Sequence, residues 1–320
     1  MQRLNRSHSK FAGKSPLAYV NPHVGHLIRR RKSPATGSRN VDFASPSANN
    51  SRSVAPNAHD LEQHPAGPQL LPPRHAAAVT HVLLLPGLAC DKEVWTRQAR
   101  TLAQIATIQI ADYSSSDSIK KMAESVLRRA PACFAIAGHS MGGRVAFEIV
   151  RRVPERVTGL ALLDTAYRPF AGGDHGERER AERLRLVEIA RTQGMRAMAR
   201  DWVRNMVHPS RISDTPLIGS IIEMFARKTP GIFAGQIKAL LERPDARPVL
   251  SSIRCPTLVL CGREDSWSTL SIHKEIAARI PQSRLVVIEN CGHMAPMERP
   301  EKVTAALVDW HSAVVREYVA

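Results

Sequence analysis

The chain has 320 residues, of which 43% are hydrophobic and 23% are charged. That composition is sufficient to bury a sizeable core. No run of 18 apolar residues occurs, which excludes an ordinary transmembrane helix. Five cysteines without a C-x-x-C pair argue against a small disulfide scaffold and a structural zinc site. We therefore expect reduced thiols, a cytoplasmic location and no membrane span.

The formal net charge of +16 is unevenly distributed. Residues 1–78 carry eleven Lys or Arg against three Asp or Glu, together with nine of the 22 prolines. This segment has no clean apolar period, which predicts a disordered basic tail. Its role stays open between a solvated arm, an upstream extension from an early start codon, a transit segment and a nucleic-acid or lipid-binding arm. We expect no nucleic-acid partner, because interleaved aromatic residues are missing.

From residue 79 onward, short apolar runs alternate with amphipathic stretches. The expected strands are 82–85, 105–110, 132–137, 159–163, 257–261 and 284–288. The expected helices between and after them are 91–102, 118–129, 143–152, 270–280 and 301–318. This alternation predicts an α/β fold, with a mostly parallel sheet covered by helices on both faces.

The alternation breaks between residues 167 and 248. Helical patterns occur there at 177–191, 195–206, 218–227 and 236–242, and no convincing strand is present. The sequence therefore predicts an all-helical cap at 167–248, inserted into a core formed by residues 79–166 and 249–320.

The most specific motif is G-H-S-M-G at residues 138–142, between a buried strand and a helix. A serine at such a tight turn presents its hydroxyl at the edge of the sheet. Side chains two positions before and after it would clash, so Gly138 and Gly142 are expected there. The helix N-terminus places backbone N–H groups beside developing negative charge. The motif predicts Ser140 as a nucleophile.

A serine nucleophile needs a base, and the base needs an orienting acid. His293 follows the last expected strand and Asp265 follows the strand before it, so both lie at the edge where parallel sheets build their sites. The order Ser140, Asp265, His293 is typical of one class of hydrolases. Asp164, at the end of another strand, is the alternative acid, and Glu264 is adjacent to Asp265.

The remaining site expectations concern the oxyanion and the substrate. The N–H groups of Met141, after the nucleophile, and Leu88, in the turn after the first strand, are the expected oxyanion donors. Trp202, Met206, Met224 and Phe225 either line an apolar pocket or hold the cap together. Trp267, two residues after Asp265, either reaches the site or packs under the sheet edge. No metal site is expected.

Four segments together resemble the α/β-hydrolase superfamily. They are G-H-S-M-G-G at 138–143, L-P-G-L at 85–88, G-R-E-D at 262–265 and G-H-M-A-P-M-E-R-P at 292–300. The similarity covers about residues 79–320 and is greatest to small-ester hydrolases, lactonases and carbon–carbon bond hydrolases. It implies a serine acyl-enzyme, a pocket between cap and core, and no metal or organic cofactor.

Two features depart from the family pattern. Pro86-Gly87 stands where many members have His-Gly, and the two small strands that usually come first are not evident in residues 60–78. The expected function is hydrolysis of a small carboxylic ester or related acyl substrate by a monomer or homodimer. Carbon–carbon bond hydrolase, lactonase, thioesterase, acyltransferase and a small-molecule receptor with incidental hydrolysis stay open.

Overall fold

The computed structural model of the chain describes residues 80–113 and 115–319. The predicted tail lies outside the described residues, and so does the segment 60–78. No helix of the described part is long and apolar enough to cross a membrane.

A six-stranded parallel sheet forms the centre of the described part, with strand order β2-β1-β3-β4-β5-β6. The strands are β1 (His81–Leu85), β2 (Thr107–Ile110), β3 (Phe134–His139), β4 (Val157–Leu163), β5 (Thr257–Gly262) and β6 (Ser283–Ile288). Strands β3 and β5 are buried along their whole length, as expected of central parallel strands. The predicted parallel sheet is confirmed.

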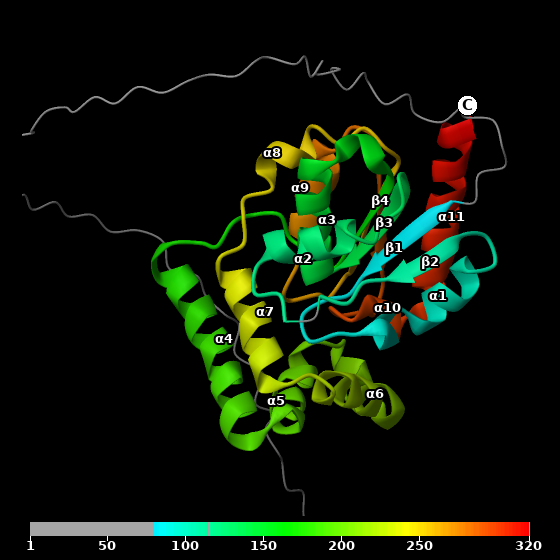
Figure 1. Cartoon of the computed structure of the whole chain (residues 1–320). Coiled ribbons are helices and arrows are strands. Elements are labelled where there is room, and N and C mark those ends of the chain that lie inside the picture. Colours follow the sequence, from blue (N-terminus) through cyan, green and yellow to red (C-terminus); the bar gives the residue numbers. More distant parts are fainter. Residues whose placement is uncertain (1–79, 114, 320) are drawn as a thin grey trace, which may run out of the picture. The chain divides into compact units, whose positions relative to one another are not determined.

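Helices cover both faces of this sheet (Figure 1). Helices α1 (Thr96–Leu102) and α11 (Pro300–Val319) pack together on one face. Helices α2 (Ile119–Leu127), α3 (Met141–Arg152) and α9 (Leu270–Arg279) cover the other. This arrangement buries both faces of the sheet at its centre, which explains why β1, β3, β4 and β5 are largely continuous apolar runs rather than alternating ones.

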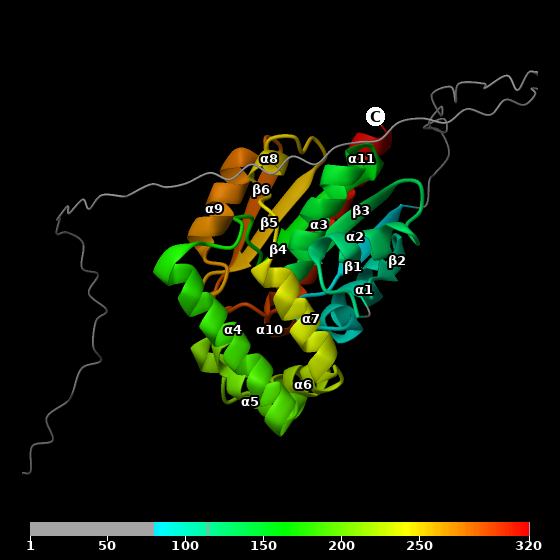
Figure 2. The same cartoon turned by 60° about the vertical axis from the view of Figure 1, so that its left-hand side comes forward.

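A helical insertion separates β4 from β5. It contains α4 (Gly173–Gln193), α5 (Met195–Trp202), α6 (Thr215–Ala226), α7 (Pro230–Leu241) and α8 (Arg247–Leu250). Figure 2 shows α4 to α7 gathered as a group at one end of the sheet.

Three helices of the insertion begin earlier than the sequence pattern predicted, and one of them is α4, which begins at Gly173 rather than at 177. The side chain of Asp214 accepts a hydrogen bond from the N–H of Leu217, so α6 begins at Thr215 rather than at 218. Thr229 caps α7 in the same way, and the proline that follows it suits the first helical position.

The strand register brings the carboxyl ends of three neighbouring strands to one edge of the sheet. Leu85 pairs with Gly138, and His139 pairs with Leu163. The carboxyl ends of β1, β3 and β4 therefore lie side by side, and the loops after them share one region.

Candidate active site

Ser140 occupies a strained turn between β3 and α3, with φ 53° and ψ −115°. A Cβ atom on Gly138 would lie 2.6 Å from the carbonyl oxygen of Gly142. One on Gly142 would lie 2.0 Å from the carbonyl oxygen of Leu85. These are backbone atoms, so no larger residue fits without moving the strands. The hydroxyl of Thr165 donates to the carbonyl of Ser140 over 2.7 Å and ties the turn to the end of β4.

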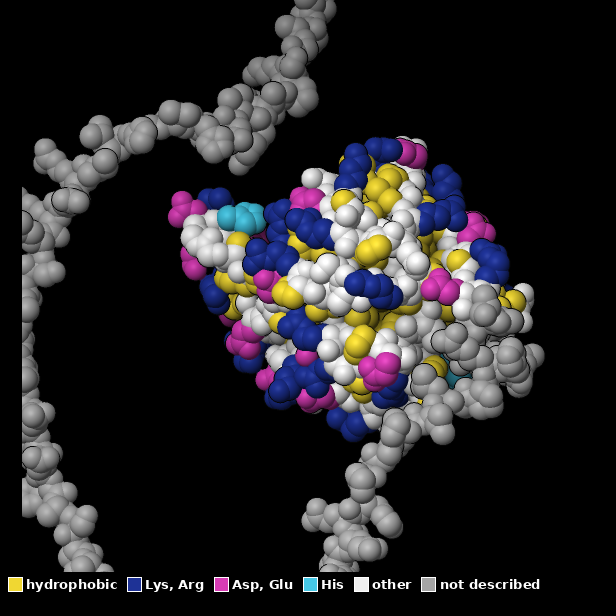
Figure 3. Space-filling view, turned by 90° about the horizontal axis from the view of Figure 1, so that it is seen from above, with side chains coloured by type: hydrophobic (Ala, Val, Ile, Leu, Met, Phe, Trp, Pro, Cys, Tyr) yellow, Lys and Arg dark blue, Asp and Glu magenta, His cyan; other side chains and the backbone are white. Residues whose placement is uncertain are grey.

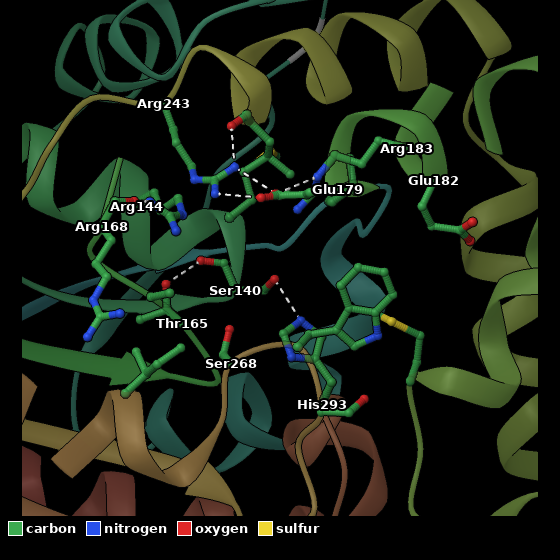
Figure 4. A pocket seen from close by; sticks show the side chains of 18 of the residues that line it. Ser140, Arg144, Thr165, Arg168, Glu179, Glu182, Arg183, Arg243, Ser268 and His293 are labelled. Carbon is green, nitrogen blue, oxygen red and sulfur yellow. Dashed lines mark hydrogen bonds and ion pairs between the residues drawn. The ribbon is translucent and has the colours of Figure 1, made fainter. Parts of the chain in front are cut away.

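Ser140, His293 and Asp265 form one hydrogen-bonded chain. The Oγ of Ser140 lies 2.8 Å from Nε2 of His293 (Figure 4). Nδ1 of His293 lies 2.8 Å from Oδ2 of Asp265. The other carboxylate oxygen of Asp265 accepts from the N–H groups of Trp267 and Ser268. A carboxylate at Nδ1 makes that nitrogen the donor, which leaves Nε2 free to accept a proton from the serine.

Asp164, the alternative acid, has a different set of partners. It is fully buried, and its two oxygens accept from the N–H groups of Gly262 at 2.9 Å and Ala295 at 3.3 Å. Burial, followed by the charge of Asp265, holds the pKa of the Asp164 carboxyl well above its usual value. No hydrogen bond joins Asp164 to His293 among the described residues, so Asp164 connects loops rather than orienting the imidazole.

Leu88 and Met141, the expected oxyanion donors, both line the cavity that contains Ser140. Within the described residues, neither backbone N–H donates to another protein group. The turn that carries Leu88 is fixed from the insertion, because the N–H of Ala89 donates to the buried Oε1 of Gln236 on α7 over 2.8 Å. Ala89 itself has φ 59°, so this bond also holds a strained residue.

His139, the residue before the nucleophile, supports the base. It is buried, and its Nε2 lies 2.8 Å from the carbonyl oxygen of His293, to which it donates. Burial is the main reason that the pKa of His139 falls to about 3, and the nearby His293 lowers it further. His139 is therefore neutral at physiological pH. Sequence reasoning missed this role, because the motif places no requirement on that position.

The loop of His293 is also held by the insertion. The N–H of His293 donates to the carbonyl of Met206 over 2.8 Å. The buried carboxylate of Glu298 accepts from the N–H groups of Gly292 at 2.9 Å and His208 at 2.8 Å. Glu298 ends a one-turn helix, α10 (Ala295–Glu298), that the sequence did not predict because it is too short to show a period.

A cavity of about 540 Å³ opens above Ser140, lined by residues of the sheet edge and of the insertion. Trp202, Met206 and Trp267 all line it. The two tryptophan rings also pack edge to face, with centroids 6.0 Å apart. The two tryptophans therefore line the cavity and also pack against each other.

Charged side chains line the same cavity, and sequence reasoning assigned none of them to the site. They are Arg144, Arg168, Arg178, Arg183, Arg243, Glu179 and Glu182. The available signal was the position of Arg144, one helical turn after the nucleophile.

The sequence profile of the Alpha/beta hydrolase family matches residues 69–307. The match covers most of the chain, and the chain therefore belongs to this family. The match begins inside the segment predicted as tail.

The proteins similar to this chain include several esterases. The chain is 30% identical to a malate-bound thermophilic esterase from Thermogutta terrifontis, with a TM-score of 0.66 over 73% of this chain and 90% of that one. It is 24% identical over 233 residues to a pimeloyl-[acyl-carrier protein] methyl ester esterase of Nitrosomonas europaea, covering 69% of this chain and 91% of that protein. The enol-lactonase of Burkholderia xenovorans LB400 shares the fold at 22% identity, with a TM-score of 0.65 over 73% of this chain and 92% of that one.

Proposed function

We propose that the protein is a serine hydrolase that cleaves carboxylic esters through an acyl-enzyme on Ser140. The observation that carries this proposal is the chain of two 2.8 Å hydrogen bonds from Ser140 through His293 to Asp265, built on a strained strand-to-helix turn. The esterases among the similar proteins support the same reaction class.

In the first half of the reaction, Oγ of Ser140 attacks the ester carbonyl carbon while its proton passes to Nε2 of His293. The carboxylate of Asp265 stabilises the imidazolium that forms. The carbonyl oxygen becomes an oxyanion, which accepts hydrogen bonds from the N–H groups of Leu88 and Met141. When the tetrahedral intermediate collapses, the alcohol leaves with the proton from His293 and the acyl group stays on the serine.

In the second half, His293 takes a proton from water, and the resulting hydroxide attacks the acyl-enzyme. Collapse of the second intermediate returns that proton to Ser140 and releases the carboxylic acid. All proton transfers in this scheme are made by side chains of the chain, and the scheme uses no metal or organic cofactor.

The helical insertion serves as a cap in this proposal, with residues 167–248 covering a core formed by 79–166 and 249–320. Its contacts with Ala89 and His293 hold both the oxyanion turn and the base. Trp202, Met206 and Trp267 provide the apolar wall against which the non-reacting part of the substrate packs.

The test is hydrolysis of short neutral esters by the full chain, with Ser140→Ala and His293→Ala as variants. We expect both variants to lose at least about 10³-fold in kcat/KM, because the triad acts as a unit. Circular dichroism and melting temperature serve as the fold control. Turnover by Ser140→Ala at the wild-type rate would contradict the proposal. Parallel assays with a lactone and a thioester identify the preferred acyl bond.

A further inference from the structure

Most charged groups that line the cavity have partners of opposite charge. Arg183 and Arg243 both bind Glu179, at 2.9 Å and 2.7 Å (Figure 4). Arg168 pairs with Glu275 at 2.6 Å. These pairs satisfy the arginines without a ligand, as is expected of charges in a partly buried wall.

Arg144 differs from these arginines. Its guanidinium donates to the carbonyl of Arg168 over 2.9 Å, and no carboxylate of the described residues lies within 4.0 Å of it. Burial, followed by the positive charges of Arg243 and Arg183, holds the pKa of Arg144 well below its usual range. The single carboxylate in this cluster, Glu179, is already shared by the other two arginines.

A cluster of three arginines around one glutamate favours a further anion. A half-buried cation is stabilised when an opposite charge pairs with it, and removal from water makes that pairing stronger. The planar guanidinium of Arg144 matches the two oxygens of a carboxylate, and most of its five N–H donors have no protein acceptor.

The position of Arg144 also suits a ligand that reacts at Ser140. Arg144 lies four residues after Ser140, in the first turn of α3, and both residues line the same cavity. In the view of Figure 4, Arg144 and Arg243 lie on one side of Ser140 and His293 on the other. A carboxylate bound at Arg144 is therefore a few carbon atoms from a carbonyl at Ser140.

On the face seen in Figure 3, Asp and Glu side chains lie among the Lys and Arg side chains. We propose that the cavity is specific for an ester that carries a carboxylate a few carbon atoms from the scissile carbonyl, and that Arg144 binds this carboxylate. The inference rests on the proposed function, because the reacting serine fixes the other end of the substrate.

The test compares two methyl esters of equal chain length, monomethyl glutarate and methyl valerate, which differ by a carboxylate in place of a methyl group. We expect wild-type kcat/KM to be higher for monomethyl glutarate. Arg144→Gln should lower the ratio of the two values by about 10- to 100-fold, the range of a charged hydrogen bond. Arg144→Lys keeps the positive charge, so its ratio of kcat/KM values should lie between those of the wild type and Arg144→Gln.

The matched control is Arg128→Gln, which removes the same charge from an exposed position outside the cavity. It should keep the wild-type ratio. The melting temperatures of the wild type and the Arg144 variants show how much the hydrogen bond from Arg144 to the carbonyl of Arg168 contributes to stability. A wild-type ratio near one, or a ratio that Arg144→Gln leaves unchanged, would overturn the inference.

A binding measurement separates this inference from the proposed function. In Ser140→Ala, quenching of Trp202 and Trp267 fluorescence should report tighter binding of monomethyl glutarate than of methyl valerate, and Arg144→Gln in that background should abolish the difference. Equal binding of the two esters would also overturn the inference. If the wild type binds the anionic ester through Arg144 but hydrolyses neither, the proposed function fails and the carboxylate site stands.

Discussion

Replacing Asp265 and Asp164 by asparagine, one at a time, distinguishes the two buried carboxylates of the site. In Asp265→Asn, the amide oxygen stays with the N–H groups of Trp267 and Ser268, and the amide nitrogen then faces Nδ1 of His293. Because the amide nitrogen can only donate, Nδ1 of His293 must become the acceptor, and the proton of the neutral imidazole moves to Nε2. A protonated Nε2 cannot take the proton of Ser140.

The expected magnitudes differ greatly between the two variants. The wrong tautomer should lower kcat by about 10³- to 10⁴-fold, equivalent to about 4–5 kcal/mol of activation free energy. Asp164→Asn instead loses one acceptor, the one 3.3 Å from the N–H of Ala295. We expect it to cost about 1–3 kcal/mol of unfolding free energy and less than tenfold in kcat.

The assay is steady-state hydrolysis of a neutral methyl ester, combined with urea unfolding of each variant. Asp265→Asn should be nearly inactive and close to wild type in stability, and Asp164→Asn should show the reverse. If Asp164→Asn were inactive while remaining folded, and Asp265→Asn were near wild type, the assignment of the acid would be wrong.

Three further predictions follow from the same geometry. Gly142→Ala should lose more than about 10²-fold in kcat/KM or fail to fold, because its Cβ would lie 2.0 Å from the oxygen of Leu85; a well-folded, fully active variant would refute the steric argument. Gln236→Ala should lower stability by about 1–3 kcal/mol and reduce kcat, because the N–H of Ala89 loses its acceptor, whereas Gln236→Glu should restore much of both; equal effects of the two substitutions would count against a positioning role. The pKa of His139 is about 3 in the folded protein against 6.5 ordinarily, so below pH 6.5 the unfolded chain takes up a proton that the folded chain does not. Stability should therefore fall by up to about 1.4 kcal/mol per pH unit from this group as the pH drops toward 3, and urea unfolding of His139→Gln should show a correspondingly smaller slope.

The predicted α/β fold came from features that are local in sequence. Continuous apolar runs such as 82–85 and 257–261 mark buried parallel strands, and the glycines at 138 and 142 mark a turn that admits no side chain. Ser140, Asp265 and His293 each follow an expected strand, so the sequence predicted them at one sheet edge without knowledge of the register. Such signals survive in a single sequence because each depends on a few neighbouring residues.

The support around the site could not be predicted, because it depends on contacts between distant segments. Gln236 binds the oxyanion turn from 147 positions away, and Glu298 joins the loop of His293 to His208 across 90 positions. The unpaired state of Arg144 likewise depends on where Glu179 lies. The pattern of apolar residues along one segment contains no information about such pairings.

Covalent labelling of the full chain by a fluorophosphonate, read by intact mass and peptide mapping, tests the central claim most directly. The probe reacts with an activated serine and does not require the natural substrate. Ser268→Ala is the control, because Ser268 lines the same cavity (Figure 4). We expect one adduct on Ser140 in the wild type and in Ser268→Ala, and none in Ser140→Ala. Labelling of folded Ser140→Ala at the wild-type rate, or no labelling of the folded wild type, would contradict the central claim.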